Sequence, residues 1–292
     1  MELRHLRYFV AVAEESNFTR ASARLRIAQP PLSQQIQALE GELGVRLFNR
    51  SSRGVVMTAA GRAFFDEAKA TLQCAQQAQV AARLGASGET GTLKLGYTGT
   101  ASFHAGFRTS LLKFRVRYPG VALVLKEGVT TELVKDVETR AVDLAFIRPG
   151  AINFADVDSM QLAVEEMVGV LPSDHPLALH SRIPLRALAK ESFLLFPRAA
   201  GPGWFDDVTG ACKKAGFDPK ISHEVPQLYS VGILVAAGMG VSLVPRSIAE
   251  QVNVPGVHYV KITKPTPRAR LALVTRPNDD SPLVKNFLSM VG

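Results

Sequence analysis

The stretch RIAQPPLSQQIQALEGELGVRLFNR, residues 26–50, places two prolines directly before a run of glutamines and leucines. Proline is tolerated in the first turn of a helix, because the N–H group that it lacks would have no partner there. Pro30 and Pro31 therefore predict the start of a helix, and Gly44 predicts its end. The apolar residues between them share one helical face: Leu32, Ile36, Leu39 and Leu43.

Two shorter helices are expected before this one. Apolar residues recur three and four positions apart over residues 6–13, and Asn17 or Thr19 can cap a second helix that buries Ala21 and Leu25. Residues 26–28 then form a turn. Three helices with a short turn between the second and the third predict a helix-turn-helix unit.

A wing and a long helix are expected next. RLFNRSSRGVVMT, residues 46–58, has the pattern of two short strands joined by a turn. The alanine-rich stretch from residue 58 to about 84 contains no proline, which predicts one long helix whose seam is Phe65, Ala68, Leu72, Ala75 and Ala82. Such a seam suits two paired helices. The alternative is a helix that lies on its own domain, but its length exceeds what a small domain covers. GASGETG, residues 85–91, predicts a flexible hinge.

Further along the chain, short Val/Leu-rich runs alternate with helical patterns in two sets, which predicts parallel sheets with crossover helices. The last strand and helix return to the first set, so we expect two α/β lobes with a cleft between them. The expected domains are a winged helix-turn-helix (1–58), a dimerising linker helix with its hinge (59–90) and a two-lobed domain (91–292). Lobe I would span about 91–163 and 268–292, and lobe II about 164–267.

The composition indicates a globular protein with a polyanionic partner. Hydrophobic residues make up 47% and charged residues 21% of the chain, which excludes a disordered protein. Residues 1–62 carry nine Arg and no Lys against five Glu, a net charge of +4, and the guanidinium fork suits phosphate and guanine. No segment approaches the ~18 apolar residues of a membrane span, so we expect a cytoplasmic protein with no membrane partner.

Signals for catalysis and for metal binding are missing from the sequence. The six histidines lie in unlike contexts without metal-ligand spacing, and phosphate-loop and nucleophile-elbow motifs are absent. Cys74 and Cys212 are far apart and predict neither a disulfide framework nor a metal cluster, although a thiol-responsive regulator is an alternative. We therefore expect no enzyme, no metal and no cofactor. A solute-binding protein would share the two lobes but lack the helix-turn-helix.

The outward face of the predicted third helix is polar and uncharged: Gln29, Pro30, Ser33, Gln34 and Gln37. Glutamine can form two hydrogen bonds with adenine, and a proline ring can press on the methyl group of thymine in the major groove. Arg50 and Arg53 in the wing add positive charge beside this face. An ordinary solvated helix face is the alternative, and the turn and the wing argue against it.

FTRASARLRIAQPPLSQQIQALEGELGVRLFNR, residues 18–50, followed by TAAG, resembles the N-terminal signature of the LysR-type transcriptional regulators. The resemblance implies a winged helix-turn-helix, a long dimerising linker helix and a periplasmic-binding-protein-like sensor domain. It further implies a homodimer that assembles to a homotetramer on double-stranded promoter DNA, where RNA polymerase can be a further partner. Base or phosphate contacts would come from Gln29, Pro30, Ser33 and Gln34, and a wing contact from Arg53. Relatives commonly have arginine at position 34 and many have serine at 28, so the operator preference can differ.

The second half resembles the subgroup of this family that controls degradation of aromatic compounds such as benzoate, catechol and chlorocatechol. The matching motifs are YTGTASF (97–103), IRPG (147–150) and SFLLFPRAAGPGWFDDV (192–208). Those relatives sense dicarboxylates of the muconate type, so the resemblance implies a small organic-acid effector, held in the cleft by Thr100, Thr130, Arg148, Pro202 and Trp204. A hydroxyl and free N–H groups at a helix start attract a carboxylate, and arginine can pair with one. The alternatives are helix capping by the threonines and a surface ion pair of Arg148 with Asp143 or a neighbour.

Overall fold

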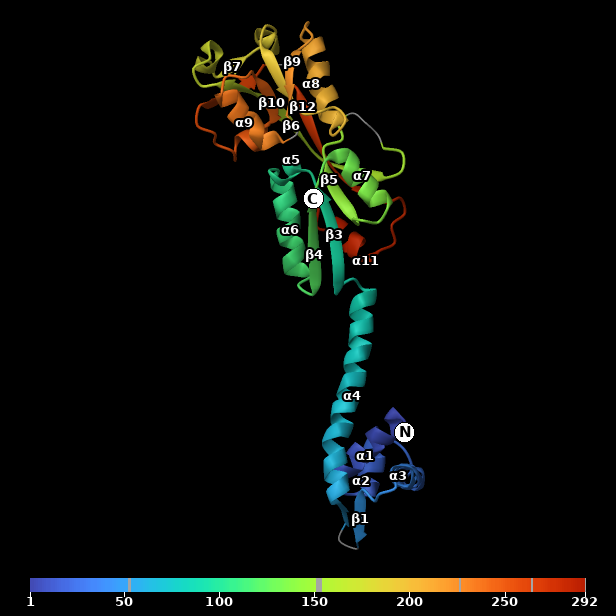
Figure 1. The fold of residues 1–292 in the computed structure, drawn as a ribbon. Helices are drawn as coiled ribbons and strands as arrows, with labels where there is room; N and C mark the ends of the chain where they lie inside the picture. Colours follow the sequence, from blue (N-terminus) through green and yellow to red (C-terminus); the bar gives the residue numbers. More distant parts are fainter. Residues whose placement is uncertain (52–53, 151–153, 226, 264, 292) are drawn as a thin grey trace. The chain divides into compact units, whose positions relative to one another are not determined.

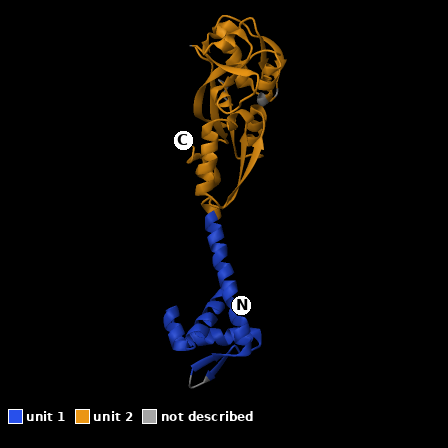
Figure 2. Ribbon diagram, turned by 90° about the vertical axis from the view of Figure 1, so that its left-hand side faces the viewer, with its two compact units in different colours: residues 1–84 blue, residues 85–292 orange. Residues whose placement is uncertain are grey.

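The computed structural model describes residues 1–51, 54–150, 154–225, 227–263 and 265–291. The chain divides into two compact units, residues 1–84 and 85–292 (Figure 2). Each unit has its own hydrophobic core, so each is described by itself. Within the described residues, no helix is both long and apolar enough to cross a lipid bilayer.

The first unit contains the expected three helices and wing (Figure 1). Its elements are α1 (Leu3–Glu15), α2 (Phe18–Leu25), α3 (Gln29–Leu43), β1 (Phe48–Ser51), β2 (Gly54–Met57) and α4 (Ala59–Ala86). The backbone N–H of Arg20 donates to Oδ1 of Asn17, so Asn17 caps α2. Pro30 and Pro31 lie in the first turn of α3, and Gly44 ends it at a φ of 70°. The predictions for these ends are confirmed.

The core of the first unit forms around Phe9 of α1, which is fully buried. Its ring centroid lies 5.1 Å from that of Phe48 in β1 and 5.0 Å from that of Phe64 in α4. These contacts fix the wing and the start of α4 against the helices. At Gly61, in the first turn of α4, a Cβ atom would lie 2.1 Å from the carbonyl oxygen of Leu47, so only glycine fits there.

Helix α4 is 28 residues long, and the first three residues of its predicted seam contact the core of the first unit. Ala68 is buried and Phe65 and Leu72 are half-buried against the core of the first unit. The first half of the helix therefore lies on its own domain, which was the alternative prediction. In the second half of the helix, the large apolar side chain of Val80 is exposed, and it lies on the face opposite to Ala82.

The second unit begins with two parallel crossovers. Its first elements are β3 (Gly91–Tyr97), α5 (Gly99–Ser102), α6 (Ala105–Arg117), β4 (Val121–Glu127), α7 (Thr130–Glu138) and β5 (Leu144–Ile147). Strand β3 pairs in parallel with both β4 and β5. Helix α6 packs on one face of these strands together with α11 (Pro282–Leu288), and α7 packs on the other face. These elements form lobe I.

Two long strands connect the lobes. They are β6 (Asp158–Pro172) and β12 (Arg268–Thr275), which pair antiparallel, and β12 also pairs antiparallel with β5. The later part of β6 pairs instead with β10 (Ser242–Pro245) and β11 (Val257–Ile262), so one strand serves both lobes. The sheet is therefore mixed: the predicted parallel part is β4, β3 and β5, and antiparallel strands join it because the chain leaves lobe I along β6 and returns along β12.

Lobe II is built around the second half of β6. Its remaining elements are the 3₁₀ helices η1 (Pro176–Leu179) and η2 (Leu185–Leu188), the strands β7 (Arg182–Ile183), β8 (Ser192–Leu195) and β9 (Lys220–Glu224), and the helices α8 (Pro202–Lys214), α9 (Leu228–Ala236) and α10 (Arg246–Ala249). Strands β8 and β9 pair in parallel. Helices α8 and α9 pack into one core with β6 and β10.

The segment predicted to be a flexible hinge is held against lobe I. Nδ2 of Asn286 in α11 donates to the carbonyl oxygens of Ser87 (2.9 Å) and Gly88 (3.2 Å). Gly88 is buried with a φ of 68°, and a Cβ atom there would lie 2.9 Å from the backbone of α11. The glycine thus permits a close backbone approach in addition to any flexibility.

Candidate functional site

The polar residues predicted to read DNA lie together on α3. Gln29, Pro30, Gln34 and Gln37 are exposed, and Ser33 is half-buried. Opposite them, Leu32, Ile36 and Leu39 are fully buried in the core of the first unit, whereas Leu43, which was predicted to share their face, is 36% exposed because it lies at the end of the helix. The exposed face is therefore held on a rigid support, which a base-reading surface requires.

Arg50 of β1 packs against this helix instead of extending freely into solvent. Its Nη1 donates to Oγ of Ser33 at 2.9 Å, and its guanidinium lies 4.5 Å from the ring centroid of Phe18. A cation over an aromatic face is attracted by about 0.5–1 kcal/mol at an exposed site. The wing and α3 are thus linked by one side chain. Arg53, the other predicted wing contact, lies outside the described residues.

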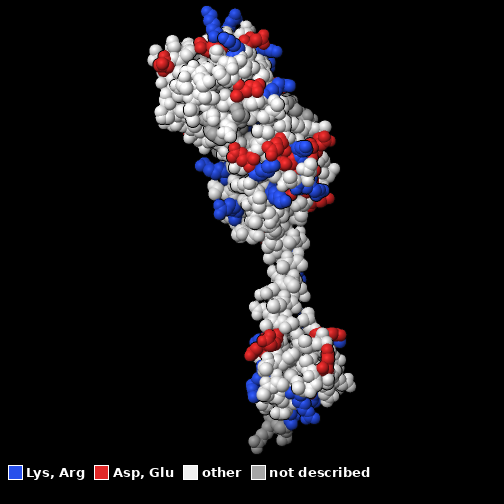
Figure 3. Space-filling model, in the orientation of Figure 1, with Lys and Arg blue, Asp and Glu red and all other residues white. Residues whose placement is uncertain are grey.

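Helix α3 starts without a side-chain cap. Its N-cap residue is Ala28, and Pro30 and Pro31 in the first turn have no N–H group that a side-chain cap could bind. In Figure 3, Lys and Arg side chains of this unit gather near the end that carries the wing.

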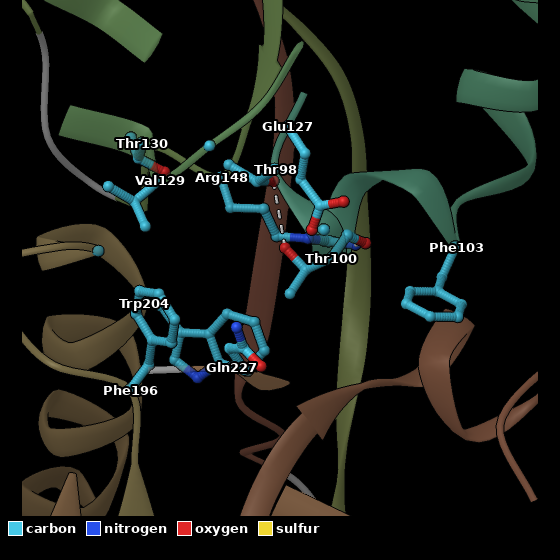
Figure 4. Close-up of a pocket in the computed structure, with 13 residues that line it drawn as sticks. Thr98, Thr100, Phe103, Glu127, Val129, Thr130, Arg148, Phe196, Trp204 and Gln227 are labelled. Atoms are coloured by element: carbon cyan, nitrogen blue, oxygen red, sulfur yellow. Dashed lines mark hydrogen bonds between the residues drawn. The ribbon is translucent and has the colours of Figure 1, made fainter. Parts of the chain in front are cut away.

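A cleft of about 460 Å³ lies in the second unit, between the two lobes (Figure 4). From lobe I it is lined by the ends of β3, β4 and β5 and by the starts of α5 and α7. From lobe II it is lined by the segment after β8, the start of α8 and Gln227. The lobes also touch directly, because Oγ1 of Thr131 donates to the carbonyl oxygen of Ala199 at 3.4 Å. A volume of this size suits a small molecule.

The predicted threonines lie on the lobe I wall, and neither of them is an N-cap residue. Thr98 precedes α5 and its Oγ1 lies 3.2 Å from that of Thr100. Thr130 is the first residue of α7, after the N-cap residue Val129, and is buried. The capping alternative therefore does not explain Thr100 or Thr130.

Arg148 lies at the end of β5 and is only 4% exposed. Its Nη2 lies 2.7 Å from Oε1 of Glu165 and donates to the carbonyl oxygen of Thr100 at 3.2 Å. Glu165 of β6 in turn accepts from the backbone N–H and the hydroxyl of Ser247 in lobe II. Nε and Nη1 of Arg148 have no hydrogen-bond partner among the described residues. Burial lowers the pKa of the Arg148 guanidinium, and the charge of Glu165 opposes this.

The sequence offered Asp143 or a neighbour as the ion-pair partner of Arg148, and the structure excludes Asp143. Oδ1 of Asp143 lies 3.5 Å from Nη2 of Arg276, and Oδ2 accepts from the backbone N–H of Lys94 at 2.8 Å. Asp143 is therefore bound at the other end of β5. Glu165 is found beside Arg148 because β6 runs past the cleft.

The lobe II wall is aromatic. The rings of Phe196 and Trp204 stack with centroids 6.5 Å apart and planes at 28°. Pro202 begins α8 but is not among the described residues that line the cleft. Gly203, which follows it, packs so closely on lobe I that a Cβ atom would lie 2.1 Å from the carbonyl oxygen of Pro149. An aromatic wall facing a polar wall suits a flat, partly apolar small molecule.

Sequence reasoning did not single out several residues of the cleft region, among them Glu127, Glu165, Phe196 and Gln227. Glu127 lies at a strand end and Phe196 and Gln227 lie in loops, where a single polar or aromatic residue gives no periodic signal. Phe196 stood in a quoted motif but was not singled out. Only the folded topology places these residues near Arg148.

Neither of the two cysteines lines the cleft. Cys212 is fully buried in α8, and burial raises the pKa of its thiol to about 12. Cys74 is exposed on α4, in the other unit. A thiol with a raised pKa is a poor nucleophile, which argues against a sensor role for Cys212. Over the part of the chain that the structure describes, no group of three or more His, Cys, Asp or Glu residues could hold a metal ion.

Two family models match the chain. Residues 3–62 match the model described as bacterial regulatory helix-turn-helix protein, lysR family, and residues 86–292 match the LysR substrate binding domain. The first match contains the polar face of α3, and the second contains the whole cleft.

Relatives are similar over the full length. The chain is 39% identical over 291 residues to the uncharacterized HTH-type transcriptional regulator YnfL of Escherichia coli (strain K12), covering 98% of this chain and 96% of YnfL. It is 38% identical to the HTH-type transcriptional regulator BudR of Raoultella terrigena, covering 99% and 100%. These relatives are regulators and not enzymes.

Solved structures of regulators are also similar to the whole chain. CbnR, a LysR family transcriptional regulator, matches with a TM-score of 0.88 and 30% identity over 100% of both chains. Full-length CbnR complexed with its target DNA matches with a TM-score of 0.86 and 30% identity, covering 100% of this chain and 98% of that one. The chain therefore belongs to the LysR family of DNA-binding transcriptional regulators, with an N-terminal helix-turn-helix and a C-terminal effector-binding domain.

Proposed function

We propose that a small organic anion binds in the cleft between the lobes and controls how this regulator acts on promoter DNA. The observation that carries this proposal is the buried Arg148, whose Nε and Nη1 have no partner among the described residues. A buried donor without a partner costs free energy of about 1–3 kcal/mol, and more when it is charged. A carboxylate that reaches this guanidinium would recover part of that cost.

The N-terminal ends of two helices support the proposal of an anionic effector. Helix α7 has nine residues and α8 has thirteen, both start at the cleft, and neither has a side-chain cap. The positive ends of both helix dipoles therefore face the cleft lining, where they favour a negative charge. We propose Thr100, Thr130, Arg148 and Trp204 as contact residues, and Pro202 as the residue that fixes the start of α8.

The binding test is a thermal-shift screen of aromatic and aliphatic carboxylic acids against the full-length protein. An acid present at about one hundred times its dissociation constant stabilises the folded state by ~2.7 kcal/mol. We expect at least one acid to raise the melting temperature, and its matching amide, which has the same shape without the charge, to have no effect. Equal shifts by the acid and the amide would contradict an anion site.

We further propose that Gln29, Pro30, Ser33, Gln34 and Gln37 read base edges while Arg50 and Arg53 bind the DNA backbone. Gln29→Ala should weaken binding to a site selected from random DNA by about 1–3 kcal/mol and leave non-specific DNA binding unchanged, because base contacts specify and phosphate contacts position. Arg50→Ala should weaken both and flatten the salt dependence. Fluorescence anisotropy on both DNAs over a salt series measures this. An equal loss on both DNAs for Gln29→Ala would rule out base reading.

We propose that the later part of α4 joins two chains, and that dimers assemble to a tetramer in the cytoplasm, where RNA polymerase is a further partner at the promoter. Val80 is 48% exposed and lies on one helical face with Gln73, Gln76, Gln77, Ala81 and Leu84. Operators with two half-sites need two reading helices held together.

Val80→Glu should therefore dissociate the dimer, because a buried interface would have to hold an unpaired charge. Sedimentation velocity measures the change, and operator affinity should fall with it. Ala82→Glu, on the opposite face of the helix, is the matched control and should leave the dimer intact. A dimer that survives Val80→Glu but not Ala82→Glu would show that the other face is the interface.

A further inference from the structure

The lobe I wall of the cleft carries a carboxylate whose charge is not neutralised. Glu127, the last residue of β4, is exposed and lines the cleft, and it makes no ion pair with any of the described residues. Its neighbour is the hydroxyl of Tyr97, which donates to Oε2 at 3.5 Å. Its Oε1 lies 2.7 Å from where a Cβ atom of Gly99 would be. In Figure 4 its side chain points from β4 toward Thr98 and Thr100.

The nearby cations are engaged elsewhere. Lys126 precedes Glu127 on the same strand, and the alternation of side chains along a strand directs it to the opposite face. There its Nζ lies 2.9 Å from Oε1 of Glu132 and 2.6 Å from Oδ2 of Asp136. Arg148 is paired with Glu165. The polar wall thus presents the guanidinium of Arg148, which is already paired with Glu165, and the carboxylate of Glu127, which is unpaired among the described residues.

This charge balance restricts what the cleft can accept. A first carboxylate of the effector is favoured by the helix starts and by the free donors of Arg148. A second carboxylate would lie in the same cleft as Glu127, and like charges placed together discriminate against a ligand. A hydroxyl or an ammonium group of the ligand would instead donate a hydrogen bond to the carboxylate of Glu127. This bond would replace a hydrogen bond to water that the ligand displaces.

We propose that Glu127 selects effectors that carry one carboxylate and, at the other end, a hydrogen-bond donor, so that the effector is a hydroxy acid or an amino acid in its chemistry and not a dicarboxylate. The proposal rests on the proposed function of the cleft as an anion site and adds the second group of the ligand. Tyr97 and Gly99 hold the carboxylate in place, the first by its hydrogen bond and the second by leaving room.

The test uses two matched series of acids with the full-length protein. One series is butyrate, 4-hydroxybutyrate, 4-aminobutyrate and succinate. The other is benzoate, 4-(hydroxymethyl)benzoate, 4-(aminomethyl)benzoate and terephthalate. Calorimetric titration should show, in at least one series, a donor-bearing acid that binds at least about tenfold more tightly than its dicarboxylate, a difference of ~1.4 kcal/mol.

Glu127→Gln keeps the shape of the side chain and removes its charge. It should reduce the preference for the donor-bearing acid over its dicarboxylate by about tenfold or more, since the charge of Glu127 is what separates these two ligands. Glu132→Gln is the matched control, because it removes the same charge from an exposed residue that pairs with Lys126 and does not line the cleft. It should leave the preference unchanged.

The outcomes separate this inference from the proposed function. If the dicarboxylates or the unsubstituted acids bind as tightly as the donor-bearing acids, or if Glu127→Gln leaves the preference intact, the role of Glu127 is overturned while the anion site stands. If no acid of either series binds to any variant, the anion site fails and the inference fails with it.

Discussion

Arg148→Met is expected to lower the free energy of unfolding of the second unit by about 3–5 kcal/mol and to abolish binding of the effector acid. The first effect follows because Glu165, whose side chain is 13% exposed, would lose its cationic partner, and an uncompensated buried charge is costly. The second follows because the carboxylate of the effector would lose the guanidinium that faces it. Urea unfolding and calorimetric titration measure the two effects separately.

The double variant Arg148→Met/Glu165→Gln distinguishes the two roles. It removes both charges, so most of the lost stability should return, since replacing a whole buried pair is often neutral. Binding of the acid should stay abolished. Arg148→Lys should bind the acid only weakly, because an ammonium cannot offer the paired donors of the guanidinium fork. Recovery of both stability and acid binding in the double variant would show that Arg148 is only a structural residue.

Gly203→Ala is expected to reduce acid binding by more than about tenfold and to destabilise the second unit by about 1–3 kcal/mol. The added Cβ atom would lie 2.1 Å from the carbonyl oxygen of Pro149 and 2.5 Å from the backbone nitrogen of Gly150, and backbone cannot move aside as a side chain can. The end of β5, which carries Arg148, and the start of α8, which carries Trp204, would have to separate.

Gly210→Ala is the matched control on the same helix. Nothing lies within 4 Å of a Cβ atom at Gly210, so alanine there should stabilise α8 by up to about 1 kcal/mol through its higher helix propensity. Both variants are measured by urea unfolding and by titration with the responsive acid. Tolerance of Gly203→Ala equal to that of Gly210→Ala would show that the lobes do not depend on this close approach.

The fold of the first unit could be predicted from local signals. Pro30, Gly44 and the polar cap Asn17 each act within one helical turn, so the residues themselves mark the ends of α2 and α3. The reading face follows directly from the buried face of the same helix. The link between Arg50 and Ser33 could not be predicted, because the two residues lie on different elements whose packing sets the distance.

The cleft depends more on long-range structure. The position of Arg148 at a strand end could be read from the strand DLAFI, but its partner could not. Glu165 lies on β6, whose 15 residues serve both lobes, and neither the length of that strand nor its antiparallel partner β12 has a local signature. The same holds for α4, where Phe65 and Leu72 show helical spacing that fits an intermolecular seam and a domain core equally well.

The most direct test of the proposed control by an organic anion uses Trp204, the single tryptophan of the chain, which lies in the cleft wall. The acid found by the thermal-shift screen is titrated into the full-length protein while tryptophan emission and the anisotropy of a labelled operator are recorded together. We expect the emission to change saturably, with the same midpoint as the change in operator binding, and both changes to vanish in Arg148→Met/Glu165→Gln. A change in operator binding with unchanged Trp204 emission would contradict the assignment of the cleft as the control site.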